Sequence, residues 1–156
     1  MMRGSIGLTI LSLSCVLGSI HSDIRLPTHL KPELYKIELL PFIIPDNFTI
    51  NGKLELTMLC EEESRNVTLH AKNLTLNEEN IKLINLGNGK SISITEHEYD
   101  IERDFYIARL SENLIKGTKY QISINYTAKL KDNNFGFYQS VYKDQETGLN
   151  EYGFVI

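Results

Sequence analysis

An alternation of apolar and polar side chains constrains this chain more than any other feature, and it extends through most of residues 23–156. The clearest case runs from Tyr120 to Leu130, where every second residue is apolar or aromatic and the residues between them are polar. Successive side chains of a strand point to opposite faces of a sheet, so this segment predicts a half-buried strand of an antiparallel sheet. The same period recurs in the segments that begin at Tyr35 and Phe48.

Further short strands are predicted around 67–69, 74–76, 81–83, 92–94 and 105–107. Asn88-Gly89 is a strong signal for a tight hairpin between two of them. The segment Ser111–Gly117 has a helix-capping residue and a stop, and it allows about one helical turn. Sheets with one apolar face must pack against another layer. We therefore predict an all-β domain of antiparallel sheets, arranged as a sandwich or as a strongly curved sheet.

The first residues predict a secretory leader. A short basic start, Met1–Arg3, precedes the apolar run 6–17, and small residues suited to cleavage lie between Gly18 and Ser22. A membrane-spanning helix needs roughly 20 predominantly apolar residues, and this run is shorter. We predict a signal peptide over 1–22, with an uncleaved anchor as the alternative, and one mature domain over 23–156.

Entry into the secretory pathway would give meaning to four Asn-x-Thr triplets. They begin at Asn47, Asn66, Asn73 and Asn125, and all four are candidates for N-glycosylation. Asn47 follows Pro-Asp in an expected turn, whereas Asn125 lies within a predicted strand and must face water to be modified. The predicted location is extracellular or on the outer face of the plasma membrane.

Loss of Cys15 with the leader would leave Cys60 as the single cysteine of the mature chain, so no internal disulfide is expected. Cys60 is interpreted as a buried small hydrophobe at the end of a strand, with a bond to another chain or segment as the alternative. The formal net charge of −4 argues against nucleic acid as a partner. Glu61–Glu63 is interpreted as a solvated turn.

The residues with reactive side chains do not form a recognisable catalytic pattern. His97-Glu98 opens like the zinc-protease motif His-Glu-x-x-His, but the fifth position is Ile101. The surrounding sequence alternates like a strand, which would not bring positions one and five together as a helix does. No Gly-x-Ser-x-Gly nucleophile motif or helix-linked phosphate loop occurs. No catalytic, metal-binding or cofactor-binding residue is therefore assigned.

Several segments, in order, resemble the M1 family of zinc aminopeptidases of the aminopeptidase N type. The matching segments are 25–39, Phe48 to Leu56 with Gly52 between them, 67–74, 114–130 and Gly-Phe-Tyr-Gln-Ser at 136–140. The resemblance implies an N-terminal β-domain with saddle-like sheets that pack against a catalytic domain. It also implies that the zinc ligands and the peptide-binding loops belong to that later domain, and none of their motifs occurs in this chain.

The resemblance thus predicts the C-terminally incomplete N-terminal domain of a secreted or cell-surface aminopeptidase, which removes N-terminal residues from peptides. Alone, the chain is expected to be inactive, to bind no zinc, and to be marginally stable or self-associating. Its expected partner is the catalytic domain of the same polypeptide, and a C-terminal membrane anchor is compatible with this prediction. Two alternatives are an autonomous secreted β-sandwich that binds a ligand, and a truncated aminopeptidase that acts as a decoy without hydrolysis.

Overall fold

The computed structural model describes residues 24–44, 47–130 and 138–155. At residues 138, 139, 154 and 155 it describes the backbone only. The predicted signal peptide 1–22 lies outside the described residues, as do Gly136 and Phe137 of the Gly-Phe-Tyr-Gln-Ser segment. The described part is built almost entirely of strands, which confirms the all-β prediction. No helix in it is long and apolar enough to cross a membrane.

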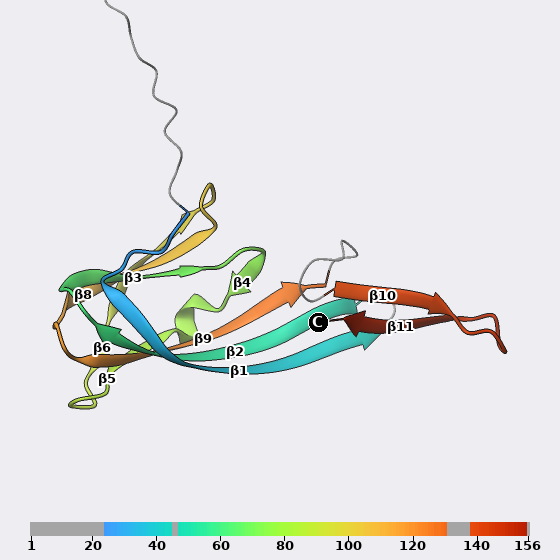
Figure 1. The fold of residues 1–156 in the computed structure, drawn as a ribbon, viewed down its shortest axis with the longest axis horizontal. Helices are drawn as coiled ribbons and strands as arrows, with labels where there is room; N and C mark the ends of the chain where they lie inside the picture. The colour runs from blue at the N-terminus through green and yellow to red at the C-terminus, as the bar shows by residue number, and fades with distance from the viewer. Residues whose placement is uncertain (1–23, 45–46, 131–137, 156) are drawn as a thin grey trace, which may run out of the picture.

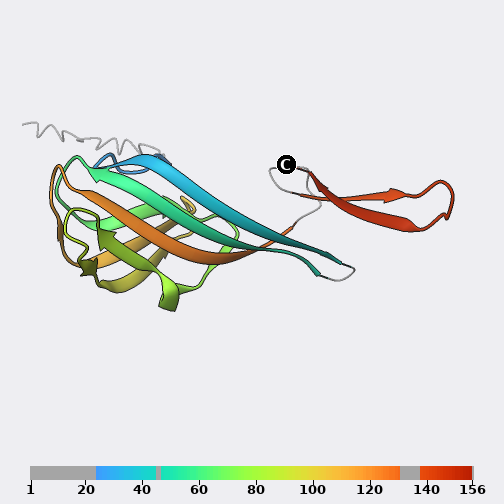
Figure 2. The ribbon, with the colours of Figure 1, turned by 90° about the horizontal axis from the view of Figure 1, so that it is seen from below.

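The larger sheet has six antiparallel strands in the order β1-β2-β9-β5-β6, with β4 also paired to β9. Its strands are β1 (Leu30–Ile44), β2 (Asn47–Cys60), β4 (Leu74–Leu76), β5 (Lys82–Asn85), β6 (Ser91–Ile92) and β9 (Lys119–Lys129). A single 3-10 turn, η1 (Glu78–Asn80), follows β4. Strands β1, β2 and β9 are long and curved, and they extend beyond the other strands of the two sheets (Figures 1 and 2).

The smaller sheet has the order β3-β8-β7 and covers part of the larger one (Figure 1). Its strands are β3 (Ser64–His70), β7 (Ile94–Asp100) and β8 (Phe105–Leu114). A separate hairpin, β10 (Tyr138–Lys143) and β11 (Asn150–Val155), lies past the ends of β1 and β2 (Figure 2). Its Tyr152 ring contacts Phe48, with the ring centroids 5.4 Å apart.

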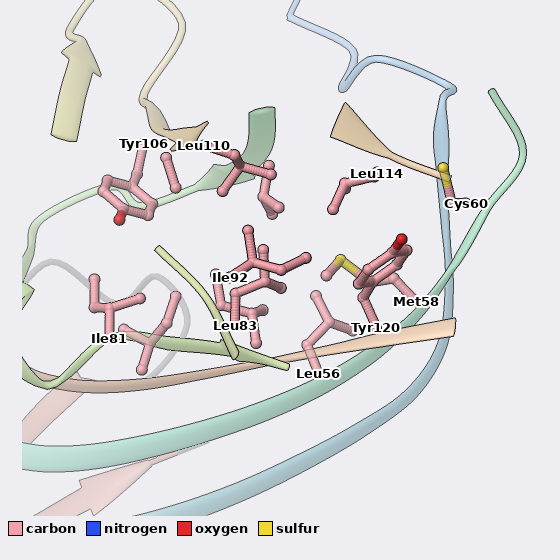
Figure 3. Close-up of a cluster of buried hydrophobic side chains, with 14 residues drawn as sticks. Leu56, Met58, Cys60, Ile81, Leu83, Ile92, Tyr106, Leu110, Leu114 and Tyr120 are labelled. Atoms are coloured by element: carbon pink, nitrogen blue, oxygen red, sulfur yellow. The ribbon is translucent and has the colours of Figure 1, made fainter. Parts of the chain in front are cut away.

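The hydrophobic core fills the space between the two sheets. Leu56, Leu83 and Tyr120 point from the larger sheet toward Tyr106 and Leu110 of the smaller one (Figure 3). One row of directly opposed residues crosses five strands, Tyr35-Leu56-Ile122-Leu83-Ile92. The alternation read from the sequence therefore corresponds to a sandwich core, and the register aligns the apolar positions of neighbouring strands.

The row is not buried at its β1 end. Tyr35 keeps 52% of its surface exposed, whereas Leu56 keeps 1%. Ile37 and Leu39, on the same face of β1, are also exposed. The alternation in β1 predicted a half-buried strand, and the structure shows a strand that is exposed along most of its length. The reason is topological, because β1 is the edge of the larger sheet and has a neighbour on one side only among the described strands.

The segment Ser111–Gly117 differs from the expected helical turn. Strand β8 continues to Leu114, whose side chain is fully buried, and a tight turn follows. Gly117 has a φ of 80°, a conformation that favours glycine, and its N–H donates to the carbonyl of Cys60 at 2.7 Å. The hydroxyl of Tyr120 accepts a hydrogen bond from the N–H of Ile115 at 2.9 Å. Tertiary contacts thus override the local helix signals.

The hairpin predicted at Asn88-Gly89 is confirmed. Gly89 has a φ of 71° and lies between β5 and β6, which pair with each other in antiparallel orientation. The side chain of Asn85 accepts a hydrogen bond from the N–H of Gly87 at 2.8 Å, and that of Asn88 accepts one from the N–H of Lys90 at 2.9 Å. Short polar side chains thus satisfy backbone groups within the turn, as asparagine commonly does.

Candidate functional surfaces

A broad polar concavity of about 870 Å³ lies over the long strands beside η1. Its lining includes Glu38, Asn51, Lys53, Glu78 and Asn125. The Lys53 ammonium donates a hydrogen bond to the Glu55 carboxylate at 2.8 Å. This hydrogen bond and the negative charge of Glu55 raise the pKa of Lys53. The concavity offers amide, carboxylate and ammonium groups at its surface. Such a surface suits contacts with a polar ligand or another protein domain.

A second, apolar cavity of about 270 Å³ opens between the two sheets near β1. Tyr35, Ile37 and Ile124 line it from the larger sheet, and Leu69 and Tyr106 line it from the smaller one. His70 is the only imidazole among its lining residues, and no carboxylate or thiol belongs to that lining. The cavity therefore brings together apolar contact surface without a pair of groups suited to acid–base chemistry.

Gly52 and Tyr126 both line the polar concavity, and Tyr126 also lines the apolar cavity. They are opposed across β2 and β9, and the Tyr126 ring covers Gly52 so closely that a Cβ there would lie 2.1 Å from its Cζ. Burial raises the pKa of the Tyr126 hydroxyl. The absence of a side chain at position 52 leaves room for the Tyr126 ring. The sequence analysis noted Gly52 only as a part of a motif, and the close contact could be found only from the β2–β9 register.

His97 lies on β7 and is part of a local polar network. Its Nδ1 is 2.7 Å from the hydroxyl oxygen of Tyr106, and the Tyr99 hydroxyl donates to Glu78 at 2.8 Å. Burial raises the pKa of Tyr106 well above its ordinary value, and burial together with Glu78 raises the pKa of Tyr99 to about 12. These phenols stay protonated at neutral pH and can serve as hydrogen-bond donors there.

The strand predicted around His97-Glu98 is confirmed, and it separates His97 from Ile101 instead of stacking them as a helix would. Glu98 receives two hydrogen bonds from Arg109 on β8, at 2.9 and 2.8 Å. This contact lowers the pKa of Glu98 and occupies both carboxylate oxygens. Across the described ranges, no group of three or more His, Cys, Asp or Glu residues is placed to hold a metal ion.

Cys60 is fully buried at the end of β2, which confirms its interpretation as a small core residue. Its thiol donates to the carbonyl of Glu62 at 3.1 Å. Burial, and then the charge of Glu63, raises the pKa of the thiol. A buried thiol with a raised pKa is a poor nucleophile because the thiolate is the reactive form.

The four candidate glycosylation sites have different environments. Asn73 and Asn125 are exposed, and Asn73 has a φ of 55°. Asn125 thus faces water although it lies within β9, as its modification would require. Asn47 and Asn66 are half-buried, and each accepts a hydrogen bond from the threonine two residues later, at 2.9 and 3.3 Å.

Comparison with known proteins places this geometry in context. The sequence model of one protein family, the peptidase M1 N-terminal domain, matches residues 31–154. The chain is 27% identical over 126 residues to aminopeptidase N of Bos taurus and 30% identical over 128 residues to aminopeptidase Ey of Gallus gallus. Each of these matches covers 77% of this chain and 13% of the relative. Aminopeptidase 2 of Candida albicans is 28% identical over 127 residues, which are 81% of this chain and 12% of that protein.

The chain therefore spans about an eighth of the length of the curated relatives it matches. The family match includes every described strand from β2 to β10, which confirms the resemblance inferred from the motifs. This chain belongs to the peptidase M1 N-terminal domain family.

Proposed function

We propose that this chain is the non-catalytic N-terminal domain of a zinc aminopeptidase, and that it supports a catalytic domain of the same polypeptide. The observation that carries the proposal is the family match over 31–154, in a segment that corresponds to only 13% of the matched aminopeptidases. In this proposal the polar concavity and the exposed face of β1 supply contact surface for the catalytic domain. The full protein would remove N-terminal residues from peptides.

The zinc ion of such an enzyme does not fit the residues of this domain. A catalytic zinc site needs three converging protein ligands, and the part of the chain that the structure describes has no such group. His97 is engaged with Tyr106, and Glu98 is held by Arg109. The zinc and the reacting groups are therefore assigned to the catalytic domain, and no step of catalysis is assigned to this chain.

A domain exchange tests the proposal directly. Residues 31–154 would replace the matched segment of aminopeptidase Ey of Gallus gallus, and hydrolysis of an aminoacyl-coumarin substrate would be measured. The chimera is expected to hydrolyse the substrate and to lose activity with a chelator, whereas this chain alone is expected to be inactive. The matched control is the same relative with that segment deleted.

The other outcomes separate the alternative functions. Hydrolysis by this chain above a heat-killed control would contradict the proposal. A folded but inactive chimera would favour the autonomous binding module, or the decoy if this chain also lowers the activity of the intact enzyme. Elemental analysis adds a second measurement, because stoichiometric zinc in the purified chain would contradict the assignment of the metal to another domain.

We further propose that the protein enters the secretory pathway and reaches the extracellular side of the membrane. The support is the apolar leader 1–22 and the four Asn-x-Thr triplets, of which Asn73 is exposed and lies outside the lining of the polar concavity. Expression in insect cells should yield a secreted chain that begins between residues 19 and 23 and that shifts in mass after glycosidase treatment. Retention in the cytosol, or secretion without glycans, would contradict one or both parts.

A further inference from the structure

Strand β1 presents a sheet edge with a regular arrangement of side chains. Within the described part of the chain it pairs with β2 on one side and forms the outer strand of the larger sheet. Pro32 and Pro41 bound its central segment 34–40, and the register with β2 is irregular between Pro32 and Leu34. Within this segment, Leu34, Ile37 and Leu40 are 50%, 56% and 59% exposed. The outer edge of this short segment leaves backbone groups that another strand could pair with, and the two prolines restrict such pairing to the segment between them.

The charges next to this edge alternate across the two strands. Lys36 lies opposite Glu55, and Glu38 lies opposite Lys53. The Lys53 ammonium is 3.9 Å from the Glu38 carboxylate and 2.8 Å from that of Glu55. The pKa of Glu55 is lowered, first by its hydrogen bond from Lys53 and to a lesser degree by the charge of Lys36. At the open edge, Lys36 and Glu38 present opposite charges two residues apart on one face.

We propose that β1 is a self-complementary edge that pairs with β1 of a second copy of this chain. In an antiparallel pair centred on Ile37, Lys36 lies opposite Glu38 of the second copy, and Glu38 lies opposite its Lys36. Negative and positive charges then alternate across four neighbouring strands. The order is Glu55 on β2 and Lys36 on β1 of one copy, followed by Glu38 on β1 and Lys53 on β2 of the other. Leu34 lies opposite Leu40 on the same face, and Tyr35 lies opposite Leu39 on the other face.

Neighbouring registers lose this match. A pair centred on Lys36 or on Glu38 places two like charges directly opposite each other, which is destabilising. A shift by one residue would exchange the two faces of the strand. The prolines limit the pairing to the central segment, because neither can donate a ladder hydrogen bond. The symmetric pair uses both β1 edges, so it forms a closed dimer and not a fibre.

Charge exchange at positions 36 and 38 tests the pairing. Lys36→Glu and Glu38→Lys each place like charges opposite each other in the homodimer, and each is expected to weaken self-association by about tenfold or more. An equimolar mixture of the two variants restores both opposite-charge pairs in the heterodimer, so its association is expected to return toward the wild-type value. Analytical ultracentrifugation of the purified full chain measures all three. Lys82→Glu is the matched control, since Lys82 is exposed on β5 of the same sheet.

Disulfide trapping tests the register. Ile37→Cys places two thiols across the symmetry axis, where opposed Cα atoms are about 4.5 to 5.5 Å apart and within disulfide range. Leu40→Cys is the matched control, because the two copies of residue 40 would lie about 20 Å apart in this register. Oxidation is expected to produce a covalent dimer with the first variant and not with the second. The wild-type chain controls for its own cysteines, Cys15 and the buried Cys60.

Each remaining outcome contradicts the proposal. A chain that stays monomeric at high concentration, or a dimer that ignores the charge exchanges, would exclude this edge as the interface. A covalent dimer of the Leu40→Cys variant, without one of the Ile37→Cys variant, would exclude the register. Circular dichroism with a thermal melt on every variant separates loss of pairing from loss of the fold. Glu38 and Lys53 also line the polar concavity that the proposed function assigns to the catalytic domain, so the self-association is measured on this chain without that domain.

Discussion

The ring of Tyr126 occupies the position that a side chain at Gly52 would need. A Cβ at position 52 would lie 2.1, 2.3 and 2.6 Å from three atoms of the tyrosine, Cζ, Cε2 and the hydroxyl oxygen. The two residues are directly opposed across β2 and β9, so the contact depends on the register of these strands. Tyr126 also contributes to the lining of both the polar concavity and the apolar cavity.

Gly52→Ala is therefore expected to lower the free energy of unfolding by about 1 kcal/mol, the lower end of overpacking costs, because the half-buried Tyr126 ring must move aside. Chemical denaturation monitored by circular dichroism would measure the change. Gly153→Ala is the matched control, because nothing lies within 4 Å of a Cβ built at Gly153 on β11. In the Tyr126→Ala background the same Gly52→Ala change should cost much less. Equal costs in both backgrounds would show that the tyrosine is not the cause.

The row of opposed residues Tyr35 and Leu56 allows a comparison of core and edge. Leu56→Ala removes a side chain that is 1% exposed and is expected to cost about 2 to 5 kcal/mol of stability. Tyr35→Ala, one strand away in the same row, is expected to cost much less because half of its surface already contacts water. The same denaturation measurement gives both values. A larger cost at Tyr35 would mean that the β1 face is covered in solution.

Acid should destabilise the domain through its paired carboxylates. Arg109 lowers the pKa of Glu98, and Arg103 lowers that of Asp100. A carboxyl whose pKa is lower in the folded state stabilises the fold above the unfolded pKa. Its contribution is lost as the pH falls from the ordinary carboxyl range through the lower folded value. We expect the melting temperature to fall as the pH is lowered below about 4.5.

A variant and a salt series separate this effect from general acid denaturation. Arg109→Gln should reduce the pH dependence of the melting temperature because Glu98 loses its partner. Arg109 is exposed and Glu98 is half-exposed, so the difference should be small and should shrink further in high salt. An Arg109→Gln chain with an unchanged pH profile at low salt would contradict the assignment of this effect to Glu98.

The sequence predicts the strands well where burial and period agree. The segment Tyr120–Leu130 has its apolar residues at every second position, and β9 lies in the middle of the larger sheet. The prediction at Ser111–Gly117 was wrong because capping residues describe local preference, whereas Leu114 is buried among residues distant in the sequence. Alternation alone could not show that Tyr35 remains exposed, because edge and central strands share the same pattern.

The candidate surfaces were harder to predict for the same reason. The contact of Gly52 with Tyr126 and the alternating charges of Lys36 and Glu55 arise from cross-strand register. Register is determined by pairs of segments and not by either segment alone. The sequence motifs could identify the family, because their order and spacing can be read along the chain without knowing which strands are neighbours.

The thiol of Cys60 should be protected in the folded protein. It is fully buried, it donates to the Glu62 carbonyl, and burial raises its pKa. Because the thiolate is the reacting species, a disulfide reagent at pH 8 is expected to react slowly with the native chain and rapidly in denaturant. The rate in the native state should follow the transient opening of the fold, so stabilising conditions should slow it further. Rapid stoichiometric labelling of the native chain, or isolation of a Cys60-linked dimer under non-reducing conditions, would contradict the structural role and favour a bond to another chain.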